Sequence, residues 1–160
     1  MKRLFILIAL ALAFLLPSSL WAATPGTCVQ TPYQIGPMSL LVRFVCTDSA
    51  DGGGMATQTV DTATMALLDG SYFLYSVTAR PTTGGTAPDA ADIAVLMNGE
   101  DLLGGKGVNL IHATATQDTL PYSAFMASYR YPRINNTVTM TIANQGTASA
   151  NYTIDLDFER

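Results

Sequence analysis

The stretch that decides the fold is IAVLMNGEDLLGGKGVNLI, which runs from Ile93 to Ile111. Apolar side chains fill both faces of its first five residues, a pattern typical of a strand with neighbours on both sides. Asn98-Gly99 follows at once and predicts a type I′ turn, because these residue types adopt positive φ most readily. Two leucines then return to the core, and Gly104-Gly105-Lys106-Gly107 predicts a tight corner. The stretch therefore indicates the middle of a small β-domain.

The first 22 residues have the pattern of a secretory signal peptide. Lys2 and Arg3 precede an apolar run from Leu4 to Leu16, and we expect cleavage near Ala22. This run is shorter than the ~20 residues that span a bilayer, so no stable membrane insertion is expected. We therefore expect a secreted or periplasmic protein whose single domain covers residues 23–160.

The mature chain is acidic. Without Lys2 and Arg3, six basic residues stand against twelve acidic ones, a net charge of −6. This balance argues against nucleic acid or an anionic membrane surface as the partner. Few windows have the apolar spacing of a helix, so helix should be scarce.

The two cysteines are predicted to form a disulfide, because export places them in an oxidising compartment. A hairpin centred on Pro37 pairs positions whose numbers sum to 74, and Cys28 and Cys46 are such a pair. They would then face each other across two antiparallel strands.

Alternating apolar residues predict the other strands. The expected strands cover residues 29–35, 39–46, 55–68, 71–80, 108–114, 138–142 and 152–158. For residues 63–68, one helical turn is the alternative. Pro32 suits an edge position for the first of these strands. We expect the last two to form an antiparallel pair joined through residues 144–146, each strand with one solvent-exposed face. About eight short strands with Gly/Pro turns predict an all-β, single-domain antiparallel β-sandwich, immunoglobulin-like or jelly-roll-like.

Residue patterns of catalysis, metal binding and cofactor binding are missing from the sequence. His112 is the only histidine, and its place in an expected strand favours a structural role. The loop from Asp48 to Gly54 lacks the alternating acids of a calcium site. The glycines at 104–107 do not have the spacing of a nucleotide-binding loop. We therefore expect no metal, no cofactor and no enzymatic activity.

The most aromatic stretch, YSAFMASYRYPR, is the candidate interaction site, because tyrosine and arginine are enriched at protein interfaces. Strand alternation would place Tyr129, Tyr131 and Arg133 on one face and Arg130 on the other. Core burial is expected for at least half of the rings. The competing surface is the loop from Asn98 to Gly107.

That loop exposes backbone donors at its glycines, and its acids Glu100 and Asp101 suit a basic partner. Turn geometry already accounts for the glycines, so the tyrosines are the preferred site.

Three features outline a resemblance that starts at Gly70. They are the strand Tyr72–Ala79 ending at Pro81, the series AVLMNGEDLLGG, and the closing segments TVTMTIAN and ASANYTIDLDF. This part of the chain resembles small β-sandwich proteins among the structural genes of tailed bacteriophages and prophages. The resemblance implies a virion-associated decoration role. A signal peptide departs from it, because virions assemble in the cytoplasm.

The sequence thus predicts an exported, non-enzymatic structural or protein-interaction module with a protein partner or self-association. The alternatives are a carbohydrate- or ligand-binding sandwich and a phage-derived virion-associated decoration protein.

Overall fold

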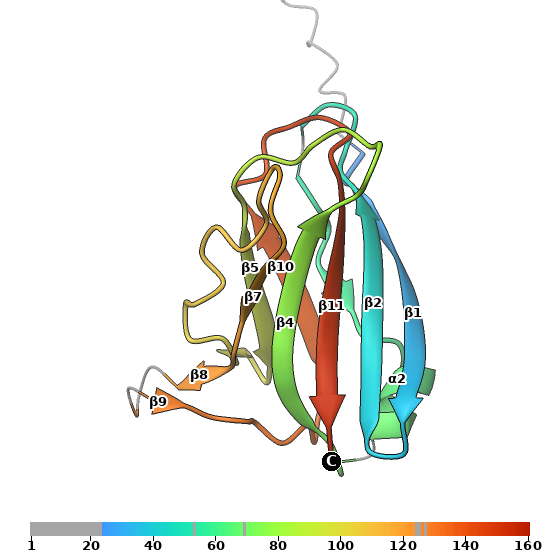
Figure 1. Cartoon of the computed structure of the whole chain (residues 1–160), viewed down its shortest axis with the longest axis vertical. Coiled ribbons are helices and arrows are strands. Elements are labelled where there is room, and N and C mark those ends of the chain that lie inside the picture. The colour runs from blue at the N-terminus through green and yellow to red at the C-terminus, as the bar shows by residue number, and fades with distance from the viewer. Residues whose placement is uncertain (1–23, 53, 69, 124–125, 127) are drawn as a thin grey trace, which may run out of the picture.

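The computed structural model describes residues 24–160 except 53, 69, 124, 125 and 127. The predicted signal peptide lies outside these residues. Two antiparallel sheets pack against each other (Figure 1), so the fold is the predicted all-β sandwich. Within the described residues, no helix is long and apolar enough to cross a membrane.

The larger sheet has five strands in the order β1-β2-β11-β4-β7. These strands are β1 (Thr27–Gly36), β2 (Ser39–Thr47), β11 (Asn151–Glu159), β4 (Phe73–Pro81) and β7 (Gln117–Thr119). The smaller sheet has the order β3-β10-β5-β6, from β3 (Gln58–Thr59), β10 (Val138–Ala143), β5 (Asp92–Met97) and β6 (Glu100–Asp101). A third, two-stranded sheet is made by β8 (Tyr122–Ser123) and β9 (Ser128–Tyr129).

The hairpin of β1 and β2 has the predicted register. Cys28 lies opposite Cys46, and the two form a disulfide with 4.0 Å between their Cα atoms. So short a separation marks a pair that exchanges no backbone hydrogen bonds. The backbone groups of every second residue of a strand point to the same side. Pro32 lies four residues after Cys28, so its backbone nitrogen also points away from β2, toward the open edge. The edge strand therefore lacks a donor in the middle of its free side.

The hairpin of β5 and β6 also follows the sequence. Asn98 and Gly99 have φ values of 55° and 79°, as a type I′ turn requires. β5 lies between β10 and β6, so the prediction that it is not an edge strand is confirmed. Gly107 then crosses β5 so closely that a Cβ atom would lie 1.9 Å from the carbonyl oxygen of Ile93.

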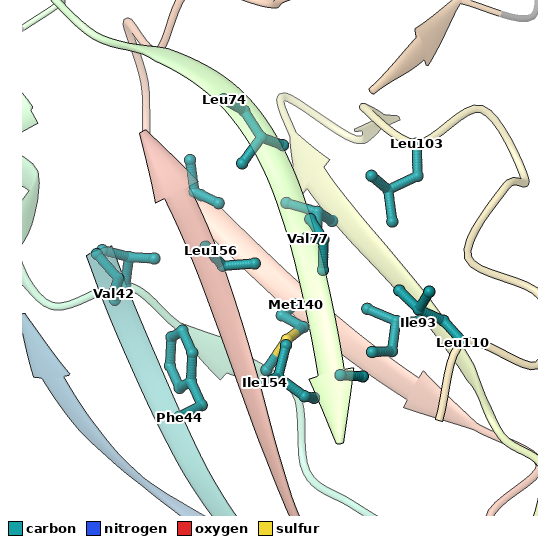
Figure 2. Close-up of a cluster of buried hydrophobic side chains, with 14 of the residues drawn as sticks. Val42, Phe44, Leu74, Val77, Ile93, Leu103, Leu110, Met140, Ile154 and Leu156 are labelled. Carbon is teal, nitrogen blue, oxygen red and sulfur yellow. The ribbon is translucent and has the colours of Figure 1, made fainter. Parts of the chain in front are cut away.

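The core lies between the two sheets. Figure 2 shows Phe44, Ile154 and Leu156 of the larger sheet with Ile93 and Met140 of the smaller one, all buried. A pairing shift in β4 changes which residues reach this core. Phe73 and Tyr75 are exposed, whereas Val77 and Ala79 are buried, because the shift adds one residue to β4 between Leu74 and Ser76.

The predicted pairing of residues 138–142 with residues 152–158 is wrong. β10 belongs to the smaller sheet and β11 to the larger one, so the connection between them crosses the sandwich. The prediction that β11 has a solvent-exposed face is also wrong, because its outward residues Thr153 and Asp155 are buried. β11 is the central strand of five, with hydrogen-bonded neighbours on both sides.

Two further expected strands differ from the structure. Residues 62–68 form the helix α2 (Thr62–Leu68), and the carboxylate of Asp61 caps it by accepting the backbone N–H of Thr64 at 2.7 Å. Residues 108–114 form no strand, and Ile111 makes a single bridge to Ala91.

Candidate functional site

The candidate aromatic segment begins as a short hairpin that stands away from the two main sheets (Figure 1). Tyr122 of β8 pairs with Tyr129 of β9, and their rings meet edge to face with centroids 5.4 Å apart. Two backbone hydrogen bonds lie at the base of the hairpin, where β8 begins and β9 ends. The N–H of Tyr122 donates to the carbonyl of Leu102 at 3.0 Å, and that of Arg130 donates to Pro121 at 3.1 Å.

The two candidate tyrosines are exposed. Tyr129 exposes 60% of its surface and Tyr131 exposes 49%, so these two rings are not among the half or more that were expected in the core. Tyr131 stacks on Tyr75 of β4, with ring centroids 5.3 Å apart and an interplanar angle of 13°. Each exposed ring therefore rests on another ring and is held in place.

The chain after Tyr131 is tied to β4. The N–H of Leu74 donates to the carbonyl of Pro132 at 3.0 Å, and the N–H of Ile134 donates to Tyr72 at 2.8 Å. Because β9 ends at Tyr129, the chain does not continue the alternation expected from the sequence.

Both arginines instead line one surface hollow of about 200 Å³, which we call the arginine hollow. Its polar and aromatic lining consists of Glu100, Asp101, Tyr122, Ser123, Arg130 and Arg133. The two surfaces that the sequence presented as competitors thus meet in one place.

Within the described residues, neither arginine has a carboxylate partner. Arg130 contacts the sulfur of Met126 at 3.0 Å, and Arg133 donates to the backbone carbonyl of Gly70. Lys106 lies above the ring of Tyr122, 4.7 Å from its centroid. Three of the six basic residues after residue 23 therefore gather around this hollow.

The acids of the hollow differ in their roles. Asp101 accepts the backbone N–H groups of Leu103 at 3.0 Å and Gly105 at 2.8 Å, so its carboxylate holds the glycine corner. Glu100 is exposed in the hairpin of β5 and β6. Glu100 is therefore the acid that is free to face a partner.

A second hollow of about 300 Å³ lies on the outer face of the larger sheet, and we call it the acidic hollow. Its lining includes Ile35, Ser39, Tyr75, Ser76, Asp157 and Glu159. The carboxylate of Asp157 accepts the hydroxyl of Ser76 at 2.9 Å. The sequence did not reveal this site, because it combines β1, β2, β4 and β11 and depends on the outward orientation of Tyr75.

A buried ion cluster forms around Asp155, which lies two residues before Asp157 on β11. Asp155 accepts two hydrogen bonds from Arg43, at 2.8 and 2.9 Å, and one from Arg80 at 2.7 Å. Burial opposes ionisation of Asp155, but the hydrogen bonds and charges of the two arginines outweigh it and lower its pKa. Arg43 and Arg80 are thus committed to the fold.

The remaining candidates have structural roles. His112 accepts the backbone N–H groups of Thr114 at 3.2 Å and Ala115 at 3.1 Å through Nδ1, which closes a turn. Asp48 accepts the N–H of Ser49 at 2.8 Å, and burial raises the pKa of Asp48. Among the described residues, no three His, Cys, Asp or Glu side chains gather as metal ligands would.

Comparison of the chain with protein-family models, with curated proteins and with solved structures found no match. The resemblance to phage structural proteins therefore stays a prediction.

Proposed function

We propose that this protein is an exported, non-enzymatic structural or interaction module that binds a protein partner through Tyr129, Arg130, Tyr131 and Arg133. The observation that carries the proposal is the exposure of two tyrosines that are already held by other rings. Such side chains lose little conformational freedom on binding and offer large apolar area with a polar tip. Arg130 and Arg133, which have no carboxylate partner in the described part of the chain, add charge that a partner can neutralise.

Export is supported by the first 22 residues and by the disulfide, which persists in oxidising compartments. Intact mass and N-terminal sequencing of the protein from its host should find a chain that begins near Ala23. A full-length chain with two alkylatable thiols would contradict export.

The interaction is tested with the double variant Tyr129→Ala/Tyr131→Ala. We expect it to keep the melting temperature within a few degrees and to lose self-association or pull-down of the partner. The matched control is Tyr33→Ala, which removes an exposed tyrosine from the edge strand β1, outside both hollows, and should leave the association unchanged. If the tyrosine variant unfolds, the rings are structural and the proposed site is wrong.

Carbohydrate binding is the second candidate. The stacked pair of Tyr75 and Tyr131 lies at a hollow that also offers the hydroxyls of Ser39 and Ser76 and the carboxylate of Asp157. Flat rings beside such groups suit a sugar. Binding on a glycan array that is lost in Tyr131→Ala would favour this function over a protein partner.

A further inference from the structure

The arginine hollow and the acidic hollow are joined by the stacked tyrosines. Tyr75 lines the acidic hollow and stacks on Tyr131, whose neighbours Arg130 and Pro132 line the arginine hollow. The acidic hollow, the stacked pair of Tyr75 and Tyr131, and the arginine hollow therefore follow one another on the surface.

The charges at the two ends of this order are not neutralised within the described chain. Among the described residues, Arg130 and Arg133 make no ion pair, and neither do Asp157 and Glu159. Glu100 and Asp101 offset part of the positive charge of the arginine hollow, and Lys106 adds to it. Both ends thus keep charged groups available to an oppositely charged surface.

A surface with acid at one end and base at the other complements itself after a half-turn. A two-fold axis through the tyrosine pair would bring each arginine hollow onto the acidic hollow of the other copy, as a closed symmetric interface requires. We propose that the partner is a second copy of this chain, and that Arg130 and Arg133 of each copy meet Asp157 and Glu159 of the other around Tyr75 and Tyr131. This inference rests on the proposed function.

Pairing through the edge strand β1 is the competing route to a dimer. Pro32 lacks an N–H where the free edge would need one, so a continuous ladder between two β1 strands is interrupted in its middle. The hollows and the tyrosines are not affected by this interruption.

The test is charge reversal in two full-length variants, Arg130→Glu/Arg133→Glu and Asp157→Lys/Glu159→Lys. By sedimentation equilibrium, wild type is expected to be a dimer and each variant alone a monomer, with at least a tenfold weaker association. Mixed together, the variants should form a heterodimer. One variant then carries acids in both hollows and the other carries bases in both, so opposite charges meet in each of the two contacts. Asp51→Lys, in the exposed loop after β2, is the control and should remain a dimer.

A monomeric wild type, a variant that still dimerises, or folded variants that do not associate on mixing would each overturn the inference. If a reversal variant does not fold, wild type in about 50 and 500 mM NaCl decides the matter, since a dimer held by these charges should weaken roughly tenfold in the higher salt. A monomeric wild type that captures another protein through Tyr129 and Tyr131 would overturn the dimer and leave the proposed function standing.

Discussion

Replacing Asp155 by alanine tests how much stability the outer face of the larger sheet contributes. Asp155 is 5% exposed and accepts three hydrogen bonds from Arg43 and Arg80. Removing one partner of a buried ion pair costs about 3–5 kcal/mol. Each arginine side chain is 32% exposed and can regain water, so we expect the lower end of this range, about 3 kcal/mol.

Urea unfolding followed by circular dichroism at neutral pH measures this loss. With a slope of about 2 kcal/mol/M, the midpoint should fall by about 1.5 M. The matched control is Asp118→Ala, which removes an exposed carboxylate from β7 and should change stability by less than about 0.5 kcal/mol. A loss below about 1 kcal/mol for Asp155→Ala would refute the reasoning.

The difference in stability between wild type and Asp155→Ala has a predicted pH dependence. The folded-state pKa of Asp155 is lowered, so its stabilisation is fully present above the unfolded pKa of about 3.9 and disappears as the pH falls through the folded pKa. The stability gap between wild type and Asp155→Ala should therefore be constant from about pH 7 to 5 and shrink below about pH 4. A gap that widens in acid would show that the carboxylate does not act as the ionised partner.

Three further changes have expected outcomes. Replacing Cys28 and Cys46 by alanine should cost about 3 kcal/mol in urea unfolding, given a sequence separation of 18, and an unchanged midpoint would show that the hairpin restrains the unfolded chain without the disulfide. Gly107→Ala should lower stability by about 3 kcal/mol or more, because its Cβ would overlap the carbonyl of Ile93, and a loss as small as that of an exposed glycine would contradict the close crossing. Tyr152→Phe should raise stability by about 1 kcal/mol, because the buried hydroxyl has no hydrogen-bond partner among the described residues, and a clear loss would indicate one.

The features that the sequence predicts correctly are local. The register of the first hairpin follows from its turn, so two cysteines nine residues either side of Pro37 face each other. Asn98-Gly99 likewise determines its own turn from two residues. In both cases the residues that set the geometry are adjacent in the chain.

The predictions that fail depend on partners far away in the chain. Alternation shows that β10 and β11 each have a buried face, but it does not show that the two faces meet across the core instead of lying in one sheet. The added residue near Tyr75 has no sequence signature, yet it turns that ring outward onto Tyr131. A helical turn at residues 63–68 was only the alternative to a strand, because the seven residues of α2 are too few for periodicity to identify a helix.

The candidate site shows the same limit. Residue type alone selected Tyr129, Arg130, Tyr131 and Arg133, and all four are exposed. The opposing acids were not predicted, because Asp157 and Glu159 belong to a strand whose pattern indicated only a solvated face. Their relation to the arginines becomes visible only when Tyr75 connects β4 to the aromatic segment.

The outward acids of β11 become more exposed toward the end of the strand. We therefore expect the buried acid to affect stability and the exposed acid to affect association. Asp155 is buried between two arginines, Asp157 is half-buried with one hydroxyl donor, and Glu159 is exposed. An acid already neutralised by arginines within its own chain has no charge to offer a partner, whereas an exposed acid contributes little to folding. Changes at Asp155 should therefore lower the free energy of unfolding of the monomer, while changes at Glu159 should weaken association and leave that free energy almost unchanged. The fold and the proposed interface thus use the same face of one strand, at opposite ends of its run of carboxylates.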